Sequence, residues 1–219
     1  MGLPSPASVN PFFKKSKEIS LREKILEVTL KAQKKDINKE LVKQLKSSFR
    51  SLANTYKNEL NYYLNDTSGV YLGKAINKHN EYKAIYKLAD PEKDFREEDV
   101  LVYNILANRY DTKYNNNKNK YAAYLDSSVY YYSKSIALDS TQADIYNAIG
   151  LIYFNQAVDI INALDYEADL EMLMESDARK ADLAMKGLPY FEKALETEPN
   201  NGKVIYALAG CYKILNSKH

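Results

Sequence analysis

The chain has 219 residues, which is long enough for one large domain, or one domain with an extension, and a substantial buried core. Gly (7) and Pro (6) are scarce, whereas Tyr is abundant (20) and Trp is absent, and this composition favours long helices over a turn-rich β fold. The single cysteine, Cys211, excludes an intrachain disulfide framework, and the net charge of +2 identifies no class of partner.

The charge is nevertheless unevenly distributed. Residues 1–50 hold 12 Lys/Arg and 5 Asp/Glu, a balance of +7, whereas residues 151–219 hold 7 and 11, a balance of −4. Such an asymmetry can steer an acidic partner toward the N-terminal part of the chain. Solvated helix faces explain it equally well.

The first 19 residues carry prolines at positions 4, 6 and 11 and several small residues, which indicates a flexible leader. This leader lacks the apolar core of a signal peptide, and no apolar run approaches membrane-spanning length. We therefore expect a cytoplasmic protein by default. It would be exported or periplasmic if a signal peptide had been removed.

Helical periodicity begins near Leu21 and is strongest over residues 38–64. The apolar stripe of this second helix recurs every three or four residues, at Leu41, Leu45, Phe49, Leu52, Tyr56, Leu60 and Tyr63. A third helix is predicted over 69–89, with Ser68 as its N-cap and His79 on its exposed face. Its apolar positions are Leu72, Ile76, Ala84, Ile85 and Leu88.

Further helices are predicted over 98–114 and 121–138, separated by an asparagine-rich loop. No segment alternates apolar and polar residues with a period of two, so the predicted fold class is all-α. We divide the chain into the leader, 1–19, an N-terminal helical region, 20–97, and a C-terminal region, 98–219.

Two stretches of the C-terminal region repeat one another at a distance of 59 residues. The first is YYSKSIALDSTQADIYNAIGLIY from Tyr131, and the second is YFEKALETEPNNGKVIYALAGCY from Tyr190. They resemble the tetratricopeptide repeat (TPR), a 34-residue helix-turn-helix unit. The resemblance implies a right-handed α-solenoid of antiparallel helix pairs. The segments GLIYFNQAVDIINAL and LPYFEKALE are similar to segments of TPR proteins from Bacteroidetes-type bacteria.

The TPR pattern of large, large, small and aromatic residues on the first helix recurs three times. It falls on Tyr103, Leu106, Ala107 and Tyr110, then on Tyr146, Ile149, Gly150 and Tyr153, and finally on Ile205, Leu208, Ala209 and Tyr212. The second helix of a unit carries Ser128, Tyr132 and Ser135, or Gly187, Phe191 and Ala194.

The spacing from Tyr146 to Ile205 exceeds one repeat by 25 residues. We expect these to form a projecting helical hairpin at about 157–186, with Pro189 kinking its second helix or starting a new one. The last helix is expected to cap the solenoid with a polar outer face, for which Lys203, Lys213 and Lys218 are suited.

The concave groove is the ligand-binding face of this family. The resemblance places eight residues in it, namely Asn104, Asn108, Asp111, Asp144, Asn147, Leu151, Phe154 and Lys203. Asparagine side chains can hydrogen-bond a peptide backbone without reading its sequence, and Leu151 and Phe154 can accept an apolar side chain. The expected function is therefore a scaffold that binds a peptide or protein partner.

The chain contains no arrangement typical of catalysis. Its two histidines, His79 and His219, are far apart in sequence, and with Cys211 they do not provide a set of metal donors at suitable spacing. No phosphate-binding loop or calcium loop is present. We expect no enzyme activity, no cofactor, no metal and no small-molecule substrate.

Two alternative functions remain open. The hairpin can mediate self-association. Met172, Leu173 and Met174 are consecutive, so at least one of their apolar side chains must face solvent on an isolated hairpin. The basic face of the helix at 38–64 can contact nucleic acid through Lys39, Lys43, Lys46, Arg50 and Lys57. This second alternative is the weaker, because the face lacks interleaved aromatic residues.

Overall fold

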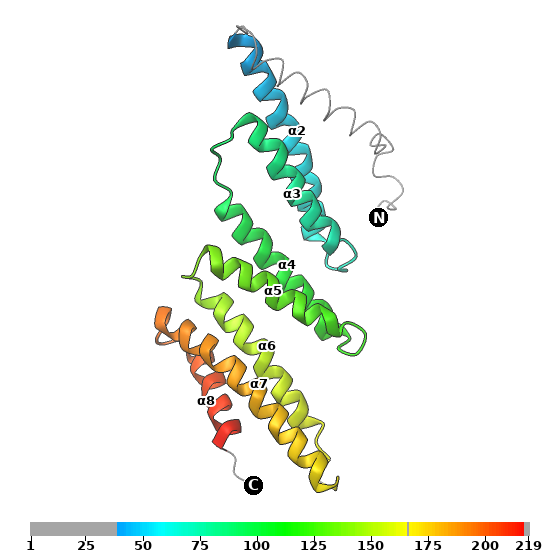
Figure 1. Ribbon diagram of the computed structural model, residues 1–219, viewed down its shortest axis with the longest axis vertical. Coiled ribbons are helices and arrows are strands. Elements are labelled where there is room, and N and C mark those ends of the chain that lie inside the picture. Colours follow the sequence, from blue (N-terminus) through cyan, green and yellow to red (C-terminus); the bar gives the residue numbers. More distant parts are fainter. Residues whose placement is uncertain (1–38, 166, 217–219) are drawn as a thin grey trace, which may run out of the picture.

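The computed structural model describes residues 39–165 and 167–216, which form seven α-helices and no strand (Figure 1). The helices are α2 (Lys39–Asn65), α3 (Leu72–Ala89), α4 (Arg96–Asn116), α5 (Ala122–Leu138), α6 (Ala143–Asn162), α7 (Leu170–Thr197) and α8 (Gly202–Asn216). The predicted all-α class is confirmed. The predicted leader, 1–19, and the helix expected from Leu21 lie outside the described residues.

Neighbouring helices pack as antiparallel pairs. The closest associations are α2 with α3, α4 with α5, and α6 with α7, and α8 lies along α7 (Figure 1). Far fewer residues connect one pair to the next, and the boundary between α3 and α4 is especially sparse. Apolar cores nevertheless cross the pair boundaries, one shared by α2, α3 and α4 and another by α4, α5 and α6.

In the α6–α7 pair, the aromatic ring of Phe191 on α7 packs against the backbone of Gly150 on α6. Phe191 is fully buried, and a Cβ atom placed on Gly150 would lie 2.7 Å from its ring. A Cβ atom on Gly187 would lie 3.2 Å from the carbonyl oxygen of Gly150. Because neither glycine has a side chain, the two helices can approach closely enough for Phe191 to fill the space between them.

The α4–α5 pair uses serines where α7 uses Gly and Ala. Ser128 is fully buried, and its hydroxyl donates a hydrogen bond of 2.8 Å to the carbonyl oxygen of Ala107. Tyr132 and Ser135 are buried on the same side of α5. These three positions match Gly187, Phe191 and Ala194 in the repeat, so a small residue marks the closest approach in both pairs.

Tyrosines fill much of the space between α2, α3, α4 and α5. Tyr110 stacks on Tyr131 with ring centroids 5.6 Å apart, and both rings pack against the core formed by α2, α3 and α4. Tyr82 meets Phe95 edge-on at 5.5 Å in a second core. Such geometries add to the burial of apolar area, which explains how a chain without Trp fills wide interhelical gaps.

Three local expectations are wrong. Helix α3 begins at Leu72 rather than at 69, and Tyr71, not Ser68, occupies its N-cap. The preceding turn is closed by the carboxylate of Asp66, which accepts hydrogen bonds from the Ser68 hydroxyl and the Val70 amide, and it passes through Gly69 at a φ of 73°.

The third concerns Pro189, for which we expected either a kink or the start of a new helix. The second alternative is wrong, and the kink stays a prediction. Helix α7 continues through this residue for 28 residues in total. A proline inside a helix removes its own amide donor, and its ring crowds the carbonyl group four residues earlier. Pro189 is exposed to solvent, and the burial of Gly187, Phe191 and Ala194 around it holds the helix together.

The long helices α6 and α7 are joined by residues 163–169, and this connection forms one end of the molecule (Figure 1). Asp169 caps α7, since its carboxylate accepts a hydrogen bond of 2.9 Å from the amide of Met172. Ala157 and Ala184 are fully buried where the helices meet. Within residues 39–165 and 167–216, no helix has the length and hydrophobicity needed to cross a bilayer.

Candidate functional site

The eight groove residues predicted from the repeat lie on three helices. Asn104, Asn108 and Asp111 belong to α4, and Lys203 belongs to α8. The remaining four, Asp144, Asn147, Leu151 and Phe154, are on α6. Each of these three helices carries the first-helix pattern of its repeat. The predicted residues therefore lie on equivalent helices, even where they do not contact one another.

Asn104 and Asn147 occupy the same repeat position, 43 residues apart, and share an unusual environment. Each side-chain carbonyl oxygen is buried yet accepts no hydrogen bond from any described residue. Asn104 is oriented by its amide group, which donates a bond of 2.7 Å to the side-chain oxygen of Gln142 at the start of α6. Buried acceptors are nearly always satisfied in folded proteins. Because these oxygens have almost no surface exposed to solvent, they can accept a hydrogen bond from a ligand only if the side chains that cover them move.

Asn108 and Asp111 meet at the hydroxyl of Tyr132. Burial raises the pKa of Tyr132 to about 12, Asp111 adds to this effect, and a hydrogen bond to Asn108 opposes it. Burial also raises the pKa of Asp111, against the effect of its hydrogen bond from Asn115. Tyr132 comes from α5 and was not among the predicted site residues, although its repeat position is shared with Phe191.

Leu151 and Phe154 are engaged in packing. Both are half-buried and contact the core formed by α6, α7 and α8. A Cβ atom on Gly210 would lie 2.7 Å from the ring of Phe154, which meets Phe191 edge-on at 6.5 Å. The ring of Phe154 thus fills the junction between α6 and α8. By contrast, Asp144 and Lys203 are exposed.

His79 is the clearest error of the sequence interpretation, because the expected exposed residue is fully buried. Its Nε2 lies 2.6 Å from a carboxylate oxygen of Asp99 on α4, and Lys83 contacts both oxygens of the same carboxylate. Burial lowers the pKa of His79, and the hydrogen bond to Asp99 only partly opposes this. The neutral imidazole therefore donates its Nε2 proton to Asp99, which joins α3 to α4.

The buried position of His79 follows a pattern present in the sequence. Leu72, Ala75, His79, Tyr82, Ile85 and Ala89 are all buried, at spacings of three and four residues. The polar neighbours of His79 led us to expect an exposed side chain, but the helical period places His79 on the apolar stripe of α3.

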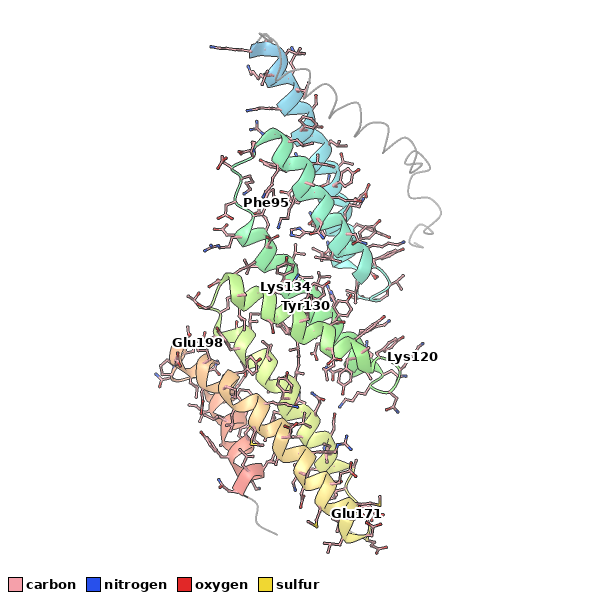
Figure 2. The ribbon with its side chains drawn as sticks, in the orientation of Figure 1. Phe95, Lys120, Tyr130, Lys134, Glu171 and Glu198 are labelled. Atoms are coloured by element: carbon pink, nitrogen blue, oxygen red, sulfur yellow. The ribbon has the colours of Figure 1, made fainter. Side chains whose placement is uncertain are left out.

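Lysines and tyrosines form a second feature that the repeat did not predict. The Nζ of Lys134 lies 4.7 Å from the ring centre of Tyr130 and 5.5 Å from that of Tyr103. Figure 2 shows Tyr130 and Lys134 close together on α5. Lys113 and Lys120 lie near the ring of Tyr121 in the same way. In cation–π contacts of this kind, the ammonium group of a lysine is attracted to the face of a neighbouring aromatic ring.

The described residues contain no group of three His, Cys, Asp or Glu side chains placed to hold a metal ion. Cys211 is fully buried, and burial raises the pKa of its thiol to about 11. A thiol that stays protonated at neutral pH is a poor nucleophile. Comparison with family models and with curated proteins found no match to this chain.

Proposed function

We propose that the chain is a non-catalytic scaffold built of tetratricopeptide-like helix pairs, and that it binds an extended peptide or protein segment along α4, α6 and α8. The antiparallel pairing of α4 with α5 and of α6 with α7 supports this proposal. So does the burial of the pattern residues, since Ala107 and Gly150 lie against the second helix of their pair, and Leu106 and Ile149 are buried in cores shared with the preceding pair.

The observation that carries the proposal is the pair of free acceptors on Asn104 and Asn147. An extended peptide presents backbone N–H groups that have no partner within the peptide itself. A buried acceptor that gains such a donor contributes more than an exposed one, because an unmade bond in a buried place is unfavourable. Equivalent asparagines on successive helices can thus hold a peptide by its backbone.

A phage library of random dodecapeptides, selected on the full chain, tests the proposal. We expect selected peptides to bind the wild-type chain and to lose about tenfold or more in affinity for the double variant Asn104→Ala/Asn147→Ala, which corresponds to about 1.4 kcal/mol. NMR spectra of the labelled chain should show the side-chain amide signals of both asparagines shifting on addition of a selected peptide.

Asn155→Ala is the matched control, because Asn155 lies on α6 but is exposed. It should leave peptide affinity unchanged. If no peptide can be selected, or if the selected peptides bind the double variant as tightly as the wild type, the assignment of the groove is wrong.

Self-association is the second candidate function, and exposed apolar side chains near the connection of α6 and α7 favour it. Leu170, Met172 and Met174 are more than half exposed, and Met185 is exposed further along α7. Figure 2 places Glu171, which lies among them, at the opposite end of α7 from Glu198. Flexible methionines of this kind are common at protein-binding surfaces.

Light scattering distinguishes this second function from the first. If the end of the α6–α7 pair mediates self-association, the wild-type chain should show a mass above that of one chain, and Met172→Lys/Met174→Lys should restore the monomer. Lys substitutions at these exposed sites leave the core intact. A wild-type chain that is monomeric at high concentration eliminates this function.

A further inference from the structure

Helix α8 presents an apolar surface to solvent. We define its outer face as Ile205, Leu208, Ala209 and Tyr212. Ile205 and Tyr212 are 46% and 45% exposed, Ala209 is exposed, and Leu208 is half-buried. The opposite side of the helix is fully engaged, since Val204, Ala207 and Cys211 are buried in the core with α7. Of the three lysines expected to make this face polar, Lys203 and Lys213 are exposed, and Lys218 lies outside the described residues.

The outer face has two counterparts in the same chain. The spacing of its four residues is repeated on α4 at Tyr103, Leu106, Ala107 and Tyr110, and on α6 at Tyr146, Ile149, Gly150 and Tyr153. On α4 and α6 the two central residues are buried: Ala107 and Gly150 lie against α5 and α7, whereas Leu106 and Ile149 belong to cores shared with the preceding pair. On α8, by contrast, Ile205, Ala209 and Tyr212 remain exposed, although Leu208 packs in part against the core and the Tyr212 hydroxyl donates a hydrogen bond of 3.3 Å to Glu192 on α7.

The two completed pairs show what kind of surface fits this pattern. In each, the covering helix presents a small residue, an aromatic four positions later, and another small residue three positions after that. These are Ser128, Tyr132 and Ser135 on α5, and Gly187, Phe191 and Ala194 on α7. The small residue permits close approach, as the bond from Ser128 to the Ala107 carbonyl shows, and the aromatic ring fills the space beside it.

The charge of α8 indicates which kind of helix can cover its outer face. Helix α8 carries Lys203 and Lys213 and no Asp or Glu. A second copy of α8 would bring lysines against lysines. Residues 20–38 hold five Lys/Arg and three Asp/Glu and are also basic. A helix flanked by carboxylates is the electrostatic complement of α8.

We infer that α8 is one half of a helix pair, completed by an acidic, amphipathic helix of a partner protein that carries the small–aromatic–small pattern. This interaction uses a surface different from the peptide groove. It belongs to the mode of recognition in which a helix lays its apolar side along an exposed groove or face, with anchors three and four residues apart.

A peptide copied from residues 182–198 provides the probe. It contains Gly187, Phe191 and Ala194, and its four carboxylates outnumber its two lysines. Fluorescence anisotropy of the labelled peptide, titrated with the full chain, should show saturable binding that weakens as salt is added. The same peptide with Phe191→Asp should bind about tenfold more weakly or not at all.

Substitutions on α8 locate the binding surface. Ala209→Glu adds a charge in the middle of the outer face and should weaken binding about tenfold or more. Gly202→Glu adds the same charge to the same helix, at a position where a Cβ atom meets nothing within 4 Å, and should leave binding unchanged. Asn104→Ala/Asn147→Ala should also leave it unchanged, so failure of this proposal is distinguishable from failure of the peptide groove.

Three results would overturn the inference. The first is equal binding of the two peptides, or binding that Ala209→Glu does not alter. The second is a wild-type dimer that Ala209→Glu dissociates, because a second copy would then cover the face. The third is a monomer that Ala209→Glu destabilises as strongly as a core substitution, because a segment of the chain itself would then lie on α8.

Discussion

The ring of Phe191 on α7 rests on the backbone of Gly150 on α6, at a distance that leaves no room for a methyl group. Both residues are buried, and Gly187 brings the backbone of α7 to the same place. The association of α6 with α7 therefore depends on the absence of a side chain at residue 150.

Gly150→Ala should destabilise the chain. Its Cβ would stand 2.7 Å from the Phe191 ring. Overpacking of this kind costs about 1–3 kcal/mol, and the better helix propensity of Ala offsets about 1 kcal/mol of it. Urea unfolding followed by circular dichroism measures the difference.

Gly73→Ala is the control, because nothing lies within 4 Å of that position on α3, and it should raise the free energy of unfolding by about 0.5–1 kcal/mol. Equal effects at the two glycines would contradict the close packing.

Phe154→Ala should separate a packing role from a binding role. The ring fills the α6–α8 junction beside Gly210, so its loss should lower the free energy of unfolding by about 2–3 kcal/mol, less than for a fully buried Phe. Asn147→Ala removes no comparable contact and should change stability little. Thermal unfolding of both variants provides the measurement. If Phe154→Ala unfolds like the wild type, the ring is free for a ligand.

The repeat predicted the packing of the C-terminal pairs well. Leu106, Ala107, Ile149 and Gly150 are buried at the positions where the pattern places them, because the spacing of large and small residues directly records which side of a helix meets its partner. The roles of the single residues predicted to line a groove were harder to infer from the sequence. Phe154 contacts α8 because Gly210 leaves space for it, a relationship between residues 56 positions apart.

Stability should fall as the solution becomes mildly acidic. The pKa of His79 is lowered by burial below its usual 6.5, so the unfolded chain binds a proton at a pH where the folded chain does not. The contribution of His79 is complete above about pH 6.5 and is lost as the pH falls through the folded-state pKa. Urea unfolding between about pH 7.5 and 5 measures it.

His79→Phe supplies the control for this pH dependence. It removes the titrating group while keeping an aromatic ring near Tyr82 and Tyr103. The variant loses the bond to Asp99 and should be less stable at neutral pH, but its stability should vary less over the same range. His219 is present in both proteins and cancels. Parallel pH profiles would show that His79 does not titrate differently on folding.

Cys211 should be unreactive in the folded chain. Burial raises the pKa of its thiol to about 11, so little thiolate exists at pH 8, and the sulfur is shielded from reagents. A chromogenic disulfide reagent should therefore react slowly without denaturant and rapidly in concentrated urea, with one thiol titrated per chain. Immediate reaction of the native protein would show that α8 detaches readily from α7.

The two free asparagine acceptors illustrate what the sequence left undetermined about the site. The repeat register placed Asn104 and Asn147 at equivalent positions, but it could not show that Gln142 engages only the amide group of Asn104 and leaves its carbonyl oxygen without a donor. Tyr132 was missed for a related reason. Its ring satisfied the packing pattern, and only the fold brings its hydroxyl to Asn108 and Asp111.

The exposure of Tyr206 has a practical optical consequence. Its side chain is 78% exposed on α8, one residue from Ile205 of the outer face. Since the chain contains no tryptophan, Tyr206→Trp would introduce a single indole whose emission is not mixed with that of any other. Blue-shifted, less quenchable emission on addition of a ligand would then report contact at this end of the molecule, whereas a ligand bound elsewhere would leave the spectrum unchanged.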